Sequence, residues 1–203
     1  MNDERERWDR KYREGSHTDL TPDPFLLQAY ENFIQPLLPK YGTVLDVAGG
    51  VGRHSIWLAE RGWESLLIDI SPVATDLATK HALERVSGMG IRVLSCDLDE
   101  MAPQPPYIET WRNKQYDLVL VFFYLNRSIF PALIESLKPG GLLLYKTYTS
   151  DHPKLSGGKG PSHPMHLLEH NELLHAFHAL RILHYRESIQ GKGVAELVAQ
   201  ANF

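Results

Sequence analysis

The segment that most constrains the fold of this chain is residues 44–53. It begins as an apolar run that ends at a carboxylate, Asp46, passes through a glycine-rich turn and continues into a helical pattern. That succession predicts a buried strand, a tight turn and a helix N-terminus. Glycine lets backbone come close to a ligand, and open α/β sheets bind ligands outside the carboxyl ends of their strands. We therefore expect this turn to hold a cofactor.

The residues around the turn narrow the choice of ligand. A phosphate-binding P-loop needs Lys followed by Ser or Thr after its last glycine, and here Arg53 and His54 follow. A dinucleotide fold places a pyrophosphate at this helix N-terminus. The carboxylate of Asp46 would repel a pyrophosphate, but it suits a ligand that carries an ammonium group.

Two further apolar runs also end in an acid. Residues 65–69 end at Asp69, and residues 91–97 end at Asp97. An acid at the tip of the second strand is placed to accept both ribose hydroxyls of an adenosine, and Asp97 could accept from an adenine amino group. The alternative for Asp46 and Asp69 is that each caps a helix, although Ser71 can already cap the helix that follows Asp69. The alternative for Asp97 is a solvated acid in a loop.

These motifs together resemble a known family. The D-x-A-G-G-x-G turn and the acids that end strands two and three look like class I S-adenosylmethionine-dependent methyltransferases. Residues 116–121 and 137–144 resemble the family's fourth strand and its turn into strand five. The N-terminal residues 8–13 (WDRKYR) look most similar to small bacterial methyltransferases of the tellurite-resistance and thiopurine-methyltransferase-like groups.

The resemblance implies S-adenosylmethionine as the cofactor and a set of residues around it. We expect cofactor contacts from Asp46, Ala48, Gly49, Gly50, Gly52, Asp69, Ile70, Asp97, Leu98 and Phe122. One residue departs from the family pattern, because Ala48 stands where a glycine is usual. We interpret it as a mild variant whose φ stays negative, since an alanine that needed the left-handed conformation would be strained.

The residues after the fourth strand are candidates for the acceptor pocket. Tyr124, Asn126 and Arg127 are large and able to hydrogen-bond, so they could hold a polar or anionic substrate. Alternatively, Arg127 binds local carbonyls and Asn126 caps the next helix. Tyr148 and His17 are weaker candidates for the same pocket. The scattered histidines show no arrangement that demands a metal, so no metal site is expected.

Composition limits the class of protein and its partners. The chain has 203 residues, which favours a single domain, and a formal net charge of −4 without a clustered basic stripe. We therefore expect a small-molecule substrate rather than a nucleic acid. One cysteine excludes an internal disulfide, and the N-terminus lacks an apolar signal region. Together with the absence of a long apolar run, these features predict a cytoplasmic monomer or homodimer without membrane contact.

The pattern of elements predicts an α/β fold. Alternating strands and helices, followed by a hairpin signal at residues 190–193, predict a Rossmann-like seven-stranded sheet. It should be mostly parallel with one antiparallel strand, and helices should cover both faces. Residues 1–40 are expected to form a helical cover and residues 41–203 the core. Helices are expected near 24–38, 128–138 and 168–178, strand five at 141–148, and a long loop at 149–166 that could close over the site.

The predicted reaction is transfer of a methyl group from a sulfonium to a small-molecule acceptor by in-line displacement. The protein would contribute mainly by positioning the nucleophile at near-attack distance. The competing hypothesis is a nucleotide-binding oxidoreductase, or a non-catalytic nucleotide sensor, on a similar sheet. The motifs do not identify the nucleophile.

Overall fold

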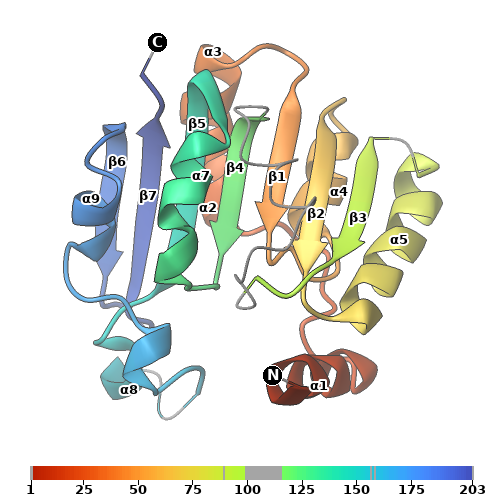
Figure 1. Cartoon of the computed structure of the whole chain (residues 1–203), viewed down its shortest axis with the longest axis horizontal. Helices are drawn as coiled ribbons and strands as arrows, with labels where there is room; N and C mark the ends of the chain where they lie inside the picture. Colours follow the sequence, from red (N-terminus) through yellow and green to blue (C-terminus); the bar gives the residue numbers. More distant parts are fainter. Residues whose placement is uncertain (1, 89, 99–115, 156, 158, 203) are drawn as a thin grey trace. The chain divides into compact units, whose positions relative to one another are not determined.

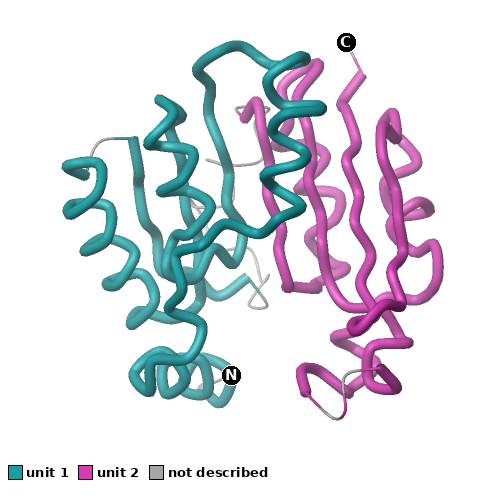
Figure 2. Tube along the Cα trace, turned by 180° about the vertical axis from the view of Figure 1, so that it is seen from behind, with its two compact units in different colours: residues 1–103 teal, residues 104–203 magenta. Residues whose placement is uncertain are grey.

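The computed structural model describes residues 2–88, 90–98, 116–155, 157 and 159–202 (Figure 1). Residues 98–115, for which Pro103, Pro105 and Pro106 predict a loop, lie mostly outside the described residues. The chain divides into two compact units, residues 1–103 and 104–203 (Figure 2). The strand order is β3-β2-β1-β4-β5-β7-β6. The predicted fold class, a mostly parallel seven-stranded sheet with an antiparallel strand near the C-terminus, is confirmed.

The first unit is built on three parallel strands. β1 (Thr43–Val47) pairs with β2 (Glu64–Asp69), and β2 pairs with β3 (Ile91–Ser95). The connecting helices α4 (Arg53–Ala59) and α5 (Pro72–Val86) pack against these strands. A parallel pair needs such a crossover, so the three strands end at the same edge. The acids predicted at their tips therefore share that edge.

The N-terminal residues add helical structure to this unit. α1 (Asn2–Arg13) packs against α5. The helix predicted after the prolines is present as α2 (Pro24–Ala29), the π-helical η1 (Tyr30–Ile34) and α3 (Gln35–Leu37). The Asp23 carboxylate accepts from the Phe25 N–H at 2.9 Å and caps the start of this run.

The second unit contains four strands. β4 (Tyr116–Phe122) and β5 (Leu137–Tyr148) are parallel, and β7 (Val194–Gln200) runs antiparallel to both β5 and β6 (Arg181–Ser188). Every residue of β4 and β7 is buried. The 3-10 turn η2 (Arg127–Ile129) and the helix α7 (Phe130–Glu135) connect β4 to β5.

Several boundaries differ from the prediction. β5 begins at Leu137, four residues early, because Tyr116 already pairs with Leu137 before an irregularity in the register. The predicted loop at 149–166 contains α8 (His152–Leu155) and the 3-10 turn η3 (Pro164–His166). The last helix, α9 (Glu172–Ala176), is shorter than predicted. Its start is fixed because the Leu168 N–H donates to Tyr148 O and Asn171 adopts a left-handed φ of 61°.

In the part of the chain that the structure describes, no helix has both the length and the apolar character needed to cross a membrane. Within the same residues, no three His, Cys, Asp or Glu side chains gather in a way that could hold a metal ion.

Candidate cofactor and acceptor sites

The glycine turn follows β1 directly and is hydrogen-bonded to β2. The Gly49 N–H donates to Ile68 O at 3.1 Å, and the Gly52 N–H donates to Gly49 O at 3.1 Å. A Cβ added at Gly49 would lie 2.7 Å from Leu67 Cγ, so no larger residue fits there without movement. Gly50 and Gly52 both have positive φ, 57° and 84°. The turn is therefore a tight structure that only small residues can form.

Ala48 does not behave as the sequence predicts. Its φ is +55°, in the left-handed region, so the expectation of a negative φ is wrong. The physical reason is the sharp reversal after Val47, which directs the next N–H toward Ile68 O. A left-handed conformation costs an L-residue about 1–2 kcal/mol. Alanine therefore carries strain at this position that a glycine would not.

Asp46 lies beneath the turn. It is 1% exposed, and its carboxylate accepts from the Ser55 hydroxyl on α4 at 2.8 Å. Burial raises the pKa of Asp46 to about 6, although the Ser55 hydrogen bond and the charge of Arg53 oppose this rise. Asp46 therefore joins β1 to the first turn of α4, which agrees in part with the helix-capping alternative.

Asp69 joins the tip of β2 to the glycine turn. One carboxylate oxygen accepts from the Gly50 N–H at 2.9 Å and the other from the Ser71 N–H at 2.9 Å. The side chain is 5% exposed, and burial raises the pKa of Asp69 despite these backbone hydrogen bonds. A carboxylate offers about four acceptor positions. The Ile70 N–H also donates to this carboxylate, so about one position remains in addition to those that the backbone uses.

The remaining predicted cofactor residues divide between the two units. The Cys96 N–H donates to Asp69 O at 2.9 Å, which brings the residues after β3 to the tip of β2. Leu98 is buried, and Asp97 and Ile70 are half-buried. Phe122 belongs to the second unit, where it is the buried last residue of β4.

The structure adds α1 residues that the sequence analysis did not include among the site residues. The Tyr12 hydroxyl lies 2.8 Å from the position that a Cβ on Gly50 would occupy. Asp9 is 9% exposed, and its carboxylate accepts from the Ser71 hydroxyl. Tyr12 also packs with Val51 and Ala74 in a small apolar cluster. The spacing of Asp9 and Tyr12, which puts both on one helix face, was the available signal.

His17 lies in the same unit, after α1. Its ring contacts Trp8, with 5.6 Å between centroids, and its φ is +60°. Burial lowers the pKa of His17, and the charges of Lys11 and Arg53 lower it further. These charges place His17 in a locally cationic environment.

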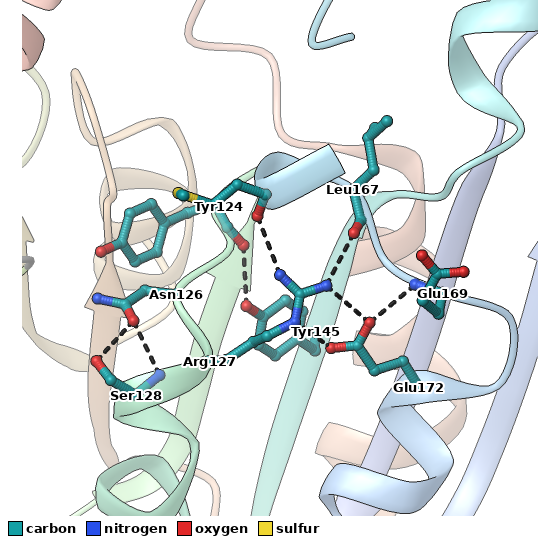
Figure 3. Close-up of polar contacts among 9 residues, drawn as sticks. Tyr124, Asn126, Arg127, Ser128, Tyr145, Leu167, Glu169 and Glu172 are labelled. Atoms are coloured by element: carbon teal, nitrogen blue, oxygen red, sulfur yellow. Dashed lines mark hydrogen bonds and ion pairs between the residues drawn. The ribbon is translucent and has the colours of Figure 1, made fainter. Parts of the chain in front are cut away.

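In the second unit, the Arg127 side chain links the turn after β4 to residues 165–172 (Figure 3). Its guanidinium holds the Glu172 carboxylate with two hydrogen bonds, of 2.6 and 2.9 Å, and also donates to Met165 O and Leu167 O. Glu172 additionally accepts from the Glu169 N–H at 2.8 Å. Arg127 therefore binds carbonyls, as the alternative interpretation expects, but they are not local, because Met165 and Leu167 lie 38 and 40 residues further along the chain.

Two neighbours of Arg127, Asn126 and Tyr124, also take part in hydrogen bonds within the second unit. The Asn126 side chain accepts from the Ser128 N–H at 2.9 Å, as expected for a capping residue. The buried Tyr145 hydroxyl donates to Tyr124 O at 2.9 Å (Figure 3). Tyr148 ends β5 and lies with its ring centroid 5.0 Å from that of Phe123.

A parallel sheet whose first strand leads into a glycine turn, with buried acids at Asp46 and Asp69, is typical of α/β proteins that bind a cofactor. A family model described as a methyltransferase domain matches residues 23–203, so the chain belongs to this family. The resemblance to class I S-adenosylmethionine-dependent methyltransferases is confirmed. S-adenosylmethionine is the cofactor that the family implies.

Individual relatives agree on the family and differ in what their names say they act on. The chain is 28% identical over 130 residues to a tRNA 5-carboxymethoxyuridine methyltransferase of Escherichia coli, covering 62% of this chain and 47% of that protein. It is 31% identical over 130 residues to a ubiquinone biosynthesis O-methyltransferase of Idiomarina loihiensis, covering 62% and 49%. The chain thus spans about half the length of the curated relatives it matches.

Among solved structures, TehB from Haemophilus influenzae superposes with a TM-score of 0.67 at 18% identity, covering 95% of this chain and 66% of TehB. This likeness shows the fold.

Proposed function

We propose that this chain is an S-adenosylmethionine-dependent methyltransferase that acts on a small-molecule acceptor. The observation that carries the choice of acceptor is electrostatic. The formal net charge is −4, whereas binding of a nucleic acid requires clustered basic residues to replace counterions. Several basic side chains are also paired with acids in the structure, including Arg127 with Glu172, Lys138 with Asp117 and Lys146 with Glu196.

The residues of the first unit fit the proposed cofactor. S-adenosylmethionine, when bound, supplies a methyl group on a positive sulfur that is already a good leaving group. Asp69 keeps about one acceptor position for a ribose hydroxyl beside the three that backbone N–H groups use. The glycine turn offers backbone without side chains, and Asp97 follows β3 on the same edge. Ala48, Gly49, Gly52, Ile70 and Leu98 complete the proposed cofactor surface.

The residues after β4 and β5 are proposed for the acceptor side of the reaction, and Phe122, the last residue of β4, stays among the proposed cofactor contacts. Tyr124, Asn126, Arg127 and Tyr148 stay in the acceptor set, with Arg127 acting through the segment it holds. His17 is the proposed contribution of the N-terminal region, and residues 1–40 are the proposed cover of the cofactor. No protein residue needs to form a covalent bond, since positioning supplies most of the catalysis in a direct displacement.

An RNA acceptor is the second candidate, because the names of several relatives specify tRNA or ribosomal RNA. Incubation of the protein with methyl-labelled S-adenosylmethionine and a cell extract separates the two. The small-molecule proposal expects label in the low-mass, ribonuclease-resistant fraction. Label that appears in polymeric RNA and disappears after ribonuclease treatment would contradict it.

A further inference from the structure

His170 lies between two carboxylates in the second unit. Its Nδ1 is 2.8 Å from Glu187 Oε2, and its Nε2 is 3.5 Å from Asp151 Oδ2. The side chain is 54% exposed, so it exchanges protons with solvent. Asp151 directly precedes α8, and Glu187 is near the end of β6. The His170 ring therefore joins three stretches of chain that are far apart in the sequence.

Backbone pairing brings Asp151 and His170 together. Thr149 and Leu168 form an isolated parallel bridge, and the Ser150 N–H donates to Leu168 O at 2.8 Å. Asp151 and His170 each lie two residues beyond this bridge, on neighbouring stretches of chain. The contact between their side chains therefore depends on the same pairing that these backbone groups maintain.

Glu187 is held in place by groups other than His170. Its Oε1 accepts from the Asn171 N–H at 2.6 Å and from the Tyr185 hydroxyl. Burial alone would raise the pKa of Glu187, but the three hydrogen bonds that its carboxylate accepts outweigh burial and lower the pKa. Burial raises the pKa of Tyr185, so its hydroxyl keeps the proton that it donates. Glu187 therefore remains an anion while His170 titrates.

The protonation state of His170 decides how many of its contacts are hydrogen bonds. A carboxylate can only accept, and a neutral imidazole has a single N–H. The shorter contact places that proton on Nδ1, where it faces Glu187. The Nε2 lone pair then faces a carboxylate oxygen of Asp151, and two acceptors repel each other. The imidazolium has an N–H at both nitrogens, so it can bind both carboxylates at once.

The charged groups around His170 favour the imidazolium. The hydrogen bond to Glu187 and its charge raise the pKa of His170, and the charges of Asp151 and Glu169 raise it further. Lys154 pairs with Asp151 at 3.6 Å and competes for that carboxylate. Histidine ordinarily changes charge near neutral pH. Because the folded pKa is raised, the stabilising effect of this group is present at low pH and is lost as the pH rises through the folded pKa.

A second attachment of the same stretch of chain does not titrate. The Arg127 guanidinium binds Glu172, Met165 O and Leu167 O, and an arginine keeps its charge in proteins. Residues 165–172 therefore have one permanent attachment, through Arg127, and one that depends on a proton, through His170.

We propose that His170 is a pH-sensitive link that ties Asp151, ahead of α8, and the residues before α9 to the end of β6. When the ring is protonated, it joins both carboxylates. When the ring is neutral, the link to Asp151 is lost, and residues 149–151 and 168–170 separate more readily. Residues 149–151 directly follow Tyr148, which is proposed for the acceptor side, so pH controls how firmly the chain beside Tyr148 is held. The inference goes beyond the proposed function and concerns the protein without ligands.

The first test is an NMR titration of the His170 ring in the full-length protein. We expect a pKa above the ordinary value of 6.5. Asp151→Asn should lower this pKa, because it removes one anion and leaves Glu187 with its other hydrogen bonds. Glu135→Gln, at an exposed acid of the same unit, is the matched control and should leave the titration of His170 unchanged. A pKa at or below 6.5, or one that Asp151→Asn does not lower, would overturn the proposal.

The second test is hydrogen exchange at the amides of Ser150 and Leu168, which lie in the paired stretches. After correction for the intrinsic pH dependence of exchange, protection of these amides should decrease several-fold as the pH rises through the measured pKa of His170, because exchange reports local opening. His170→Gln cannot ionise, so its protection should lack this decrease. Equal pH dependence in the natural protein and in His170→Gln would overturn the proposal. Neither test uses a cofactor or an acceptor, so a failure here leaves the proposed function unaffected.

Discussion

At the scale of the residue, Ala48 shows what a sequence pattern leaves undetermined. The motif identifies the turn, but whether an alanine can occupy it depends on φ, which the neighbouring hydrogen bonds decide. The structure places Ala48 at φ +55°. The carboxylates Asp46 and Asp69 are predictable from their positions after apolar runs. Their hydrogen bonds to Ser55 and Gly50 are not, because they depend on how the helix and the turn fold back.

We expect Ala48→Gly to stabilise the protein. Relief of the left-handed strain should raise the free energy of unfolding by about 1–2 kcal/mol. The greater freedom of glycine in the unfolded chain should lower it by about 0.4–1 kcal/mol. Urea unfolding should therefore show a net gain of about 0.5–1 kcal/mol. Ala59→Gly, in the helix α4, is the control and should lose about 1 kcal/mol. A loss of stability in Ala48→Gly would contradict the assigned backbone conformation.

Asp46 should make stability depend on pH. Its folded pKa, about 6, lies above the ordinary value of 3.8, so the folded state binds the proton more tightly than the unfolded state. Stability from this group is greatest below pH 4 and decreases as the pH rises to about 6. The expected decrease is ~3 kcal/mol, at 1.36 kcal/mol per pKa unit.

Asp46→Asn should remove this dependence. Unfolding measured at pH 4, 5, 6 and 7 should show the variant gaining stability relative to the natural protein as the pH rises. A constant difference across this range would show that Asp46 has an ordinary pKa in the folded protein.

At the scale of the element, strands were the easier prediction because an apolar run bounded by turns has few other interpretations. β2 ends where the sequence predicts, at Asp69, and begins one residue before the apolar run, at Glu64. The short helices α8 and α9 were harder, since contacts from distant residues define their ends. The Leu168 N–H, for example, donates to Tyr148 O and keeps the chain extended before α9. The local pattern puts Asp9 and Tyr12 on one face of α1, but it does not tell that Asp9 accepts from Ser71 at the start of α5.

Asp9 is expected to order the cofactor turn without touching the cofactor. It accepts from the Ser71 hydroxyl, while the Ser71 N–H donates to Asp69 and Asp69 in turn holds the Gly50 N–H. Asp9→Ala should therefore increase hydrogen exchange in α1 and weaken S-adenosylhomocysteine binding about 10-fold, since a hydrogen bond to a charged group contributes about 1.5–3 kcal/mol. Calorimetry measures the affinity. Asp3→Ala, exposed on the same helix, should leave both quantities unchanged.

Arg127 is expected to hold the segment 163–172 to the end of β4. Lysine keeps the charge but cannot donate in a fork to Glu172 and to two carbonyls at once. Arg127→Lys should therefore increase hydrogen exchange in 163–172, with a stability loss of about 1 kcal/mol or less, because the pair is partly exposed. Arg181→Lys, on an exposed residue of β6, is the control. Unchanged hydrogen exchange in residues 163–172 would show that the hydrogen bonds of Arg127 do not hold this segment.

At the scale of the whole molecule, the proposed cofactor residues of the first unit and the proposed acceptor residues of the second should have separable effects on ligand binding. The acids and the glycine turn follow from a strand–turn–helix pattern, so the sequence could predict them. The ion pair of Arg127 with Glu172 follows no motif, because the two residues lie 45 positions apart in the sequence. Only the three-dimensional structure reveals it.

Thermal unfolding with two ligands and two variants tests this separation. S-adenosylhomocysteine at 100 times its dissociation constant should stabilise the protein by about 2.7 kcal/mol, and NAD should give no shift, because a pyrophosphate would lie near the buried Asp46. Asp69→Ala should lose most of the S-adenosylhomocysteine shift, since the lost charge-assisted hydrogen bonds lower affinity about 10- to 150-fold. Arg127→Lys should keep the full shift, because Arg127 is proposed for the acceptor side of the reaction. Stabilisation by NAD would favour an oxidoreductase, and a shift lost equally in both variants would contradict the division between cofactor and acceptor residues.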